Sequence, residues 1–199
     1  MTQPHTVLHL VRHGQSVWNL AGRVQGQSRQ AGSLTAAGRV QAERTARLLA
    51  ERHPRAEAIL TSDLSRARDT AAIIAGVLGL PVDQDAELRE QRLGHLEGRR
   101  FAEYLDSGTV QHVIDGMWQH PDRRPPGGES VTDVYLRVHG ALARYAARYP
   151  SRELILVTHG GPVRVATAPS DPRLGAAVSQ RPVANAAIVT LTLPSFVKA

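Results

Sequence analysis

Two histidines each stand one residue after a short, mainly aliphatic run. The run 7–11 leads to His13 and the run 154–157 leads to His159, and a glycine follows each histidine. Such runs are typical of strands buried on both faces of a parallel sheet. Ligands of open α/β sheets bind at the carboxyl ends of the strands, so we expect both imidazoles in one crevice.

Arginines near these histidines indicate an anionic ligand. Arg12 precedes His13, and a guanidinium binds phosphate through two parallel hydrogen bonds while it repels a metal cation. Arg66 lies near the start of a predicted helix, where a bound anion would offset its unfavourable interaction with the helix dipole. Taken alone, each arginine has an ordinary alternative, as the end of a strand or as a solvent-exposed helix residue.

Together these residue types fit phosphoryl transfer through a histidine without a metal. His13 would attack phosphorus, while Arg12, Arg66 and His159 would neutralise the charge on the non-bridging oxygens. A carboxylic acid would protonate the leaving oxygen and later activate water. Spacing alone does not select which carboxyl group would do so.

A metal site is the main competing interpretation, because His5, His9 and His13 lie four residues apart. On a strand this spacing separates neighbours by about 13 Å, whereas the ligands of one zinc ion lie about 2 Å from it. We therefore expect no metal and no other cofactor, and ordinary structural roles for His5 and His9.

Composition favours a single-domain protein with an anionic partner. The chain has 199 residues, a formal net charge of +6 and no cysteine, so it fits one domain over 1–199 without disulfides or a thiol nucleophile. The sequence has no signal-peptide pattern and no long apolar run, so we expect a cytoplasmic protein with no membrane partner. Its arginines are dispersed and its aromatics few, which disfavours nucleic acid and leaves a small phosphorylated substrate as the expected partner.

Alternating predicted strands and helices indicate an α/β fold with a doubly wound, mainly parallel sheet flanked by helices. A long loop is expected over 14–32. The predicted strands are 7–11, 58–60, a brief extended piece from 82, 153–157, and 187–193 at the sheet edge. The predicted helices are one from the N-cap Thr35 to Arg52, one from the N-cap Ser62 to Gly79, one after a capping box of Ser130 and Asp133, and a short one over 162–168.

Residues 93–128 have a less regular pattern and are interpreted as a lid-like insertion over the strand ends, not a separate domain. Its polar and aromatic side chains would either select an anionic or sugar-like leaving group or serve packing and solvation. These side chains are Arg99, Arg100, Tyr104, Trp118, His120, Arg123 and Arg124.

Five segments occur in a characteristic order over most of the chain. They are Leu10-Val11-Arg12-His13-Gly14-Gln15-Ser16 with Asn19, Arg23-Val24-Gln25-Gly26, Thr61-Ser62-Asp63-Leu64-Ser65-Arg66-Ala67 with Thr70-Ala71, Leu88-Arg89-Glu90 with Gly94 and Leu96-Glu97-Gly98, and Val157-Thr158-His159-Gly160-Gly161. In this order the segments resemble those of the histidine phosphatase superfamily, the phosphoglycerate mutase-like proteins, and in particular their phosphatase branch.

The resemblance implies the site residues and their roles. The implied catalytic residues are His13 as the phosphorylated nucleophile, Glu90 as acid and base, and Arg12, Arg66 and His159 as phosphate ligands. The implied substrate-binding residues are Gln15, Asn19, Gln25, Gly26 and Gly160. Glu90 is preferred to Glu87 and Glu97 by its place in the motif. The implied fold is the doubly wound sheet, with 93–128 as a partial lid.

The chain departs from the family pattern in two places. Residues 30–34 lack the proline common there, which affects loop contacts. Pro162 and the segment 169–172 leave room for only a short helix after the second histidine motif. This second departure affects the sheet edge and any dimer surface, so the sequence does not decide whether the protein is a homodimer. It does not affect the implied catalytic residues.

The expected activity is metal-independent hydrolysis of a small phosphorylated metabolite, such as a phosphosugar, a phosphoglycerate derivative, a nucleotide or a biosynthetic intermediate. A phosphoglycerate-type mutase shares the phosphohistidine step. The mutase branch usually has a longer chain and Arg-His-Tyr after its acidic residue, whereas this chain has Gln91-Arg92-Leu93. A non-catalytic module that binds a phosphorylated ligand is the other alternative, because fold does not fix function.

Overall fold

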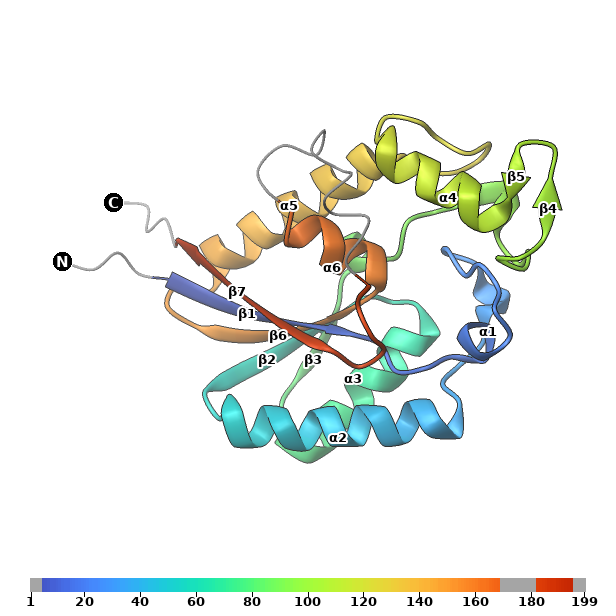
Figure 1. Cartoon of the computed structure of the whole chain (residues 1–199). Helices are drawn as coiled ribbons and strands as arrows, with labels where there is room; N and C mark the ends of the chain where they lie inside the picture. The colour runs from blue at the N-terminus through green and yellow to red at the C-terminus, as the bar shows by residue number, and fades with distance from the viewer. Residues whose placement is uncertain (1–4, 169–181, 195–199) are drawn as a thin grey trace.

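The computed structural model describes residues 5–168 and 182–194, and its centre is a five-stranded sheet (Figure 1). The strands, in sheet order, are β3 (Val82–Gln84), β2 (Ala56–Thr61), β6 (Glu153–Thr158), β1 (His5–Arg12) and β7 (Ile188–Pro194). The first four are mutually parallel, and β7 pairs antiparallel with β1 at the edge. The mainly parallel sheet, including its final edge strand, agrees with the prediction.

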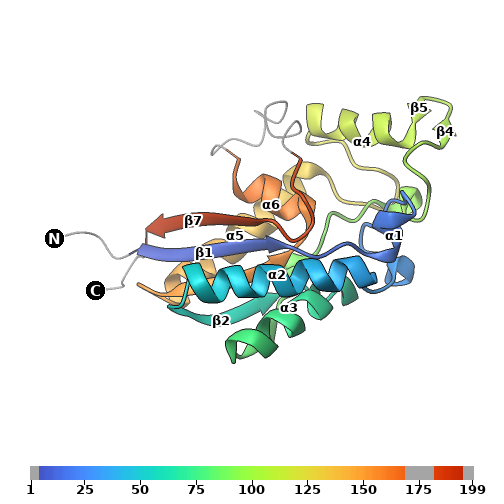
Figure 2. The same ribbon diagram turned by 60° about the horizontal axis from the view of Figure 1, so that its bottom comes forward.

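Helices cover both faces of this sheet, as Figures 1 and 2 show. One face carries α2 (Ala36–Arg52) and α3 (Ser65–Leu78), and the other carries α5 (Val131–Arg148) and α6 (Gly160–Ala166). Side chains alternate along each strand, so neighbouring residues enter different cores. Leu154 and Leu156 belong to the core on the α5 side, whereas Ile155 and Val157 belong to the core on the α2 and α3 side.

Local capping fixes the starts of two long helices where the sequence predicts them. Thr35 Oγ1 accepts a hydrogen bond from the Gly38 amide at 3.0 Å, and Ser130 and Asp133 form the predicted capping box of α5. Gly79 ends α3 in the left-handed conformation, with φ 69°. These contacts involve residues three or four positions apart, which is why sequence alone identifies them.

The predicted start of the second helix is wrong. Ser62 is not its N-cap: α3 begins at Ser65 with Leu64 in the cap position and no side-chain cap. Ser62 Oγ instead lies 2.9 Å from His159 Nε2 and also accepts the Leu64 amide at 3.3 Å. A contact across the sheet therefore uses the hydroxyl that the local pattern assigns to a helix start.

The predicted loop 14–32 contains two short helices, α1 (Val17–Leu20) and a 3₁₀ turn over Arg29–Ala31. Its first residue packs against α2 with no room for a side chain. A Cβ on Gly14 would lie 2.3 Å from the Gly38 carbonyl oxygen, so both positions require glycine. This close packing fixes the path of the loop after His13.

The insertion 93–128 lies beyond the carboxyl ends of the parallel strands, next to α1 (Figure 1). It contains the hairpin β4 (Tyr104–Leu105) and β5 (Gly108–Thr109), followed by α4 (Val110–Gln119). A 3₁₀ turn over Gly94–Leu96 lies at the start of the insertion, and another over Ala86–Leu88 precedes it. The insertion is more regular than the sequence suggests, and the buried residues of α4, which have helical spacing, are the signal for it: Val110, Ile114, Met117 and Trp118.

The last predicted helix begins two residues early, at Gly160, and ends at Ala166. The segment 169–172, which bears on the sheet edge and a dimer surface, lies outside the described residues. Within the described ranges, no helix combines the length and apolar character that crossing a membrane requires.

Candidate active site

His13 and His159 come together because β1 and β6 are parallel neighbours. Arg12 pairs with Thr158 in the register, so the residue after each strand emerges at the same edge of the sheet. The two ring centroids lie 5.0 Å apart at 63°, and the side chains are 2% and 0% exposed. The expected meeting of two imidazoles at the strand ends is therefore found.

The hydrogen bonds of His13 determine which ring nitrogen carries a lone pair. Nδ1 lies 2.7 Å from the Gly14 carbonyl oxygen, which can only accept, so Nδ1 carries the proton. Nε2 then has the lone pair and accepts from Arg66 Nε at 3.1 Å. Burial, and then the charges of Arg66 and Arg12, hold the pKa of His13 well below its ordinary value of 6.5. The neutral ring is the form a nucleophile needs.

Arg66 is a buried cation held against His13. Its side chain is 1% exposed, and Nη2 donates to the Gly26 carbonyl oxygen at 2.9 Å. Burial lowers the pKa of Arg66 to about 10, so the guanidinium remains charged at neutral pH. Arg66 is the second residue of α3, which agrees with its predicted place near the start of a helix.

Three buried side-chain nitrogens in the described part of the chain have no hydrogen-bond partner, and all three surround this site. They are Arg12 Nε, His159 Nδ1 and Arg164 Nε. Leaving a buried polar group unpaired costs about 1–3 kcal/mol, and such groups are rare in folded proteins. Their clustering indicates a place prepared for an anionic or strongly accepting ligand.

His159 is neutral for the same reason as His13. Burial, and then the charge of Arg66, hold its pKa well below 6.5. Its Nε2 is engaged with Ser62 Oγ, which leaves the unpaired Nδ1 for a ligand. If the Ser62 hydroxyl donates, Nδ1 carries the hydrogen and can donate to a phosphoryl oxygen.

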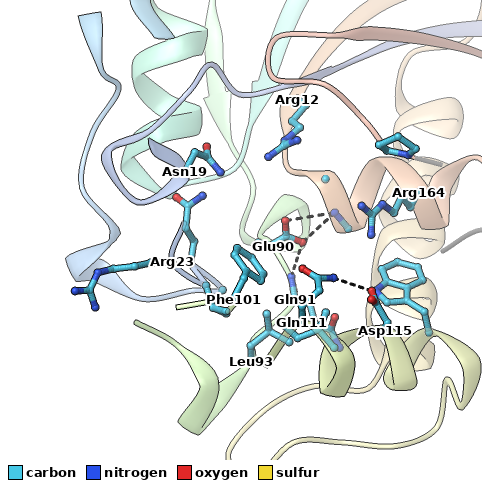
Figure 3. A pocket seen from close by; sticks show the side chains of 18 residues that line it. Arg12, Asn19, Arg23, Glu90, Gln91, Leu93, Phe101, Gln111, Asp115 and Arg164 are labelled. Atoms are coloured by element: carbon cyan, nitrogen blue, oxygen red, sulfur yellow. Dashed lines mark hydrogen bonds between the residues drawn. The ribbon is translucent and has the colours of Figure 1, made fainter. Parts of the chain in front are cut away.

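Glu90 lines the pocket and bonds the segment that follows His159. Its Oε1 accepts from the Gly161 amide at 3.1 Å and from its neighbour Gln91 at 3.0 Å (Figure 3). A Cβ at position 161 would lie 2.3 Å from Glu90 Oε1, so a side chain there would displace the carboxyl group. Glu97, by contrast, accepts the Gln27 amide at 2.9 Å and does not line the pocket. Of the three candidate glutamates, only Glu90 lines it.

The main chain of Glu90 is fixed by two side chains far away in sequence. Its carbonyl oxygen accepts from Gln27 Nε2 at 2.9 Å and from Arg137 Nη2 at 3.0 Å. Glu129 in turn bonds both of these side chains. The resulting network connects the loop after β1, the Glu90 segment and α5.

A pocket of about 400 Å³ opens in front of these groups (Figure 3). Among the predicted residues it includes Arg12, Glu90, Asn19, Gln25, Gly26 and Gly160. The other three predicted catalytic residues lie next to lining residues. His13 follows Arg12 and His159 precedes Gly160 in the chain, and Arg66 donates to the Gly26 carbonyl oxygen. The further lining residues include Arg23, Phe101, Gln111, Asp115, Trp118 and Arg164.

Gln15 does not lie on this pocket. Its amide donates to Gln41 Oε1 at 2.8 Å, and its own Oε1 accepts the Thr35 hydroxyl at 2.9 Å. It therefore fastens the loop to the start of α2. The substrate contact predicted for Gln15 stays a prediction, since the residue lies off this pocket and its main-chain amide and Oε1 bond to α2 and its N-cap.

Asn19 and Gln25 reach the pocket as one hydrogen-bonded unit. Ser16 Oγ lies 3.1 Å from Asn19 Oδ1 and 2.7 Å from Gln25 Oε1. Asn185, a residue that the sequence analysis missed, donates to Asn19 Oδ1 at 3.2 Å and to the His13 carbonyl at 3.1 Å. No local sequence signal marks Asn185, because its partners lie more than 160 positions away.

Of the seven candidate lid side chains, only Trp118 lines the pocket. Two of the others pair with carboxylates, Arg99 Nη1 with Glu103 and Arg124 Nε with Asp133, each at 2.6 Å. Arg164 on α6 lines the pocket together with Arg12 and Arg23, and its guanidinium lies 5.3 Å from the Trp118 ring centroid. Sequence reasoning missed Arg164, which no local motif marks.

The geometry agrees with what the chain resembles. The family model of the histidine phosphatase superfamily (branch 1) matches residues 8–195. The probable phosphoglycerate mutase GpmB of Klebsiella pneumoniae (strain 342) is 40% identical over 158 residues, covering 77% of this chain and 69% of that protein.

Two solved structures have the same overall fold. A mycobacterial glucosyl-3-phosphoglycerate phosphatase, solved as a complex with VO3, has a TM-score of 0.78 at 30% identity, covering 92% of this chain and 90% of its own. Bacillus stearothermophilus YhfR has a TM-score of 0.77 at 29% identity, covering 93% of this chain and 90% of its own. The chain therefore belongs to branch 1 of the histidine phosphatase superfamily and is an enzyme of the phosphatase or mutase type.

Proposed function

We propose that this protein hydrolyses small phosphomonoesters through a phosphohistidine on His13 and needs no metal for the reaction. The observation that carries the proposal is the cluster of unpaired buried nitrogens, Arg12 Nε and His159 Nδ1, beside a neutral His13 ring. A phosphoryl group would give these donors the acceptors that they lack. The mycobacterial phosphatase of the same fold and its VO3 complex support the same chemistry.

In the first step, His13 Nε2 attacks phosphorus and the bond from phosphorus to the leaving oxygen breaks. Arg66 leaves the Nε2 lone pair and, with Arg12 and His159, binds the non-bridging oxygens, where charge is stabilised in the transition state. Glu90 donates its proton to the leaving oxygen, which departs as an alcohol.

In the second step, water replaces the alcohol in the pocket. Glu90 accepts a proton from the water as its oxygen attacks the phosphohistidine, and the bond from Nε2 to phosphorus breaks. Inorganic phosphate is released and the neutral His13 is restored. Glu90 Oε1 is anchored by the Gly161 amide on the side of the second histidine, which favours its acting on both the leaving group and the water.

A phosphoglycerate-type mutase is the second candidate, because the similar GpmB proteins carry that name. A mutase must exclude water while the intermediate reorients. The insertion here consists of one short hairpin and one helix, and Gln91 follows Glu90, which favours hydrolysis. The chain supplied with 3-phosphoglycerate and a bisphosphoglycerate primer should release phosphate, with isomerisation slight or absent. Rapid isomerisation with little free phosphate would establish the mutase instead.

The test of the proposed chemistry is turnover of a panel of phosphate esters in the presence of EDTA. Phosphate release should persist, and quenched enzyme should carry acid-labile phosphate that His13→Ala removes. The exposed His5 is the matched control, since His5→Gln should leave both signals unchanged. An absolute need for a divalent metal would refute the mechanism, and ligand binding without turnover over the whole panel would favour a binding module.

A further inference from the structure

A second histidine cluster lies on the face of the sheet that α2 covers. One ring nitrogen each of His9 and His53 and one carboxylate oxygen of Glu153 lie within 4.8 Å of one another. His9 comes from the middle of β1, His53 caps the end of α2, and Glu153 begins β6. Figure 2 shows α2 running alongside β1, so the carboxyl end of α2, which His53 caps, lies back along the strand.

We propose that His9, His53 and Glu153 form a binding site for one divalent transition metal ion of the Zn²⁺ class. Two imidazoles and one carboxylate are a ligand set that zinc uses in proteins, with water in the fourth position. Imidazole-rich sites prefer zinc, copper or nickel to the oxygen-seeking magnesium and calcium.

The distances suit such an ion. His9 Nε2 lies 3.5 Å from Glu153 Oε2, close to the edge of about 3.3 Å of a tetrahedron with bonds of about 2.0 Å. The ring centroids of His9 and His53 lie 3.8 Å apart at 32°. His53 is half-buried at a helix end, and one of its ring nitrogens lies within 4.8 Å of the other two donor atoms.

The other nitrogen of His9 has the partner that a ligand histidine requires. Nδ1 lies 3.0 Å from Thr190 Oγ1 on the neighbouring strand, directly across the register. When Nδ1–H donates to this hydroxyl, the Nε2 lone pair faces a carboxylate oxygen, and a cation between these two acceptors resolves the repulsion. The metal-free alternative has the Thr190 hydroxyl donating to Nδ1 and Nε2–H donating to Glu153.

The ion pair between Arg55 and Glu153 leaves one carboxylate oxygen available to a metal ion. Arg55 Nε donates to Glu153 Oε1 at 2.8 Å and so leaves Oε2 for the metal. The Arg55 side chain is 85% exposed, so solvent screens its repulsion of a bound cation.

Such an ion would join β1, β6 and α2 without entering the reaction. His9 and His13 are four residues apart on a strand, which separates them by about 13 Å. We therefore expect the metal to raise the stability of the fold, since a ligand that binds only the native state stabilises it. Turnover should not depend on it.

The test uses the full chain without an affinity tag, stripped of metal with EDTA and then freed of chelator. Titration with Zn²⁺ against a chromophoric competitor should give one binding site. His53→Gln and Glu153→Gln should each lower its Zn²⁺ affinity by more than about 10-fold, which is the lower end of the loss expected when only an outer partner is removed. Thr190→Val tests that outer partner directly and should weaken binding about 10-fold. Added Co²⁺ should give the visible absorption of a tetrahedral site in the unaltered chain and lose it in both ligand variants.

The matched controls are His5→Gln on the same strand and His139→Gln, a histidine bonded elsewhere. Both should bind Zn²⁺ as the unaltered chain does. Zinc should also raise the unfolding temperature of the unaltered chain but not of His53→Gln, a variant at a helix end that is expected to fold. Equal Zn²⁺ affinity, or an equal rise in unfolding temperature, in the unaltered chain and His53→Gln would overturn the proposal.

Discussion

Arg66 and His13 form the central contact of the site at the scale of single residues. The Arg66 Nε–H points at the same Nε2 lone pair that the proposed reaction uses, 3.1 Å away. Without substrate, the arginine therefore keeps the ring neutral and masked. A phosphoryl group bound at Arg12 and His159 offers Arg66 a charged acceptor, and a hydrogen bond to a charged oxygen is stronger than one to a neutral ring nitrogen. Substrate binding would in this way expose the nucleophile.

Glu90→Gln should separate proton transfer from the other contributions. The amide keeps the size of the side chain but cannot donate the proton, so the loss should be largest for alkyl esters, by about 10²–10⁴-fold. A p-nitrophenyl ester, whose leaving group needs no proton, should lose much less. Single-turnover rates on the two esters measure the difference, with Glu87→Gln as the control outside the pocket. Equal losses on both esters would contradict the assigned role.

Arg164→Gln should reveal what the leaving group carries. Arg164 lines the pocket beside Trp118 and its Nε is unpaired, so we expect its guanidinium to bind an acceptor on the far end of the substrate. A lost hydrogen bond to a charged group is worth about 1.5–3 kcal/mol. KM should therefore rise by about 10- to 100-fold for esters with an anionic leaving group and little for neutral ones. The measurement is a kinetic panel of both ester classes, and Arg123→Ala, outside this pocket, should leave selectivity unchanged. An equal rise in KM for both classes would count against this contact.

At the scale of elements, the site depends on α5 as well as on the two histidine strands. Arg137 on α5 donates to the main-chain carbonyls of both Glu87 and Glu90, at 2.6 and 3.0 Å, and its Nε bonds Glu129. A helix on one face of the sheet thereby sets the position of the carboxyl group at the strand ends. Small displacements of such a group can cost about 10²-fold in rate.

Arg137→Met should therefore reproduce part of the Glu90→Gln phenotype. We expect kcat to fall by about 10-fold or more on alkyl esters and less on the p-nitrophenyl ester, because the acid is misplaced and not removed. Arg144→Met, on the same helix but with an exposed side chain, is the control. If kcat falls equally for both esters, or only the unfolding temperature changes, Arg137 has a purely structural role.

At the scale of the whole molecule, buried neutral histidines make stability depend on pH. His13, His159 and His9 all have pKa values lowered mainly by burial, whereas an unfolded histidine titrates near 6.5. Between the lowered value and 6.5 the unfolded chain binds more protons than the native one. The free energy of unfolding should thus fall as the pH decreases below about 6.5, by about 1.4 kcal/mol per pH unit for each histidine.

Denaturant unfolding in EDTA at several pH values between about 7.5 and 5.5 measures this slope, which should be near zero at the upper end. In the double variant His13→Asn, His159→Asn, the free energy of unfolding should depend less steeply on pH, by the contribution of two protons. His5→Gln, at an exposed residue, should change nothing. A slope that is identical in the unaltered chain and the double variant would show that these histidines do not titrate as expected.

The sequence by itself determined the features that depend on neighbours along the chain. The aliphatic runs before His13 and His159 identify buried parallel strands, and the caps at Thr35 and Ser130 mark helix starts, because side-chain periodicity and capping act within a few residues. Parallel pairing then brings the two histidines together without further information. The ordered motifs likewise identified the family and placed Glu90, which spacing alone did not.

Only the tertiary structure decided which partner each polar group has. Ser62 bonds His159 across the sheet and caps no helix, Gln15 fastens a loop, and Arg164 faces the pocket in place of the lid arginines. The same holds for His9, which meets His53 and Glu153 from other elements and not the histidines four residues away on its own strand. A hydrogen bond or an ion pair is short-ranged and directional, so its partner is set by how distant segments pack, and that packing is not written in any local stretch of the chain.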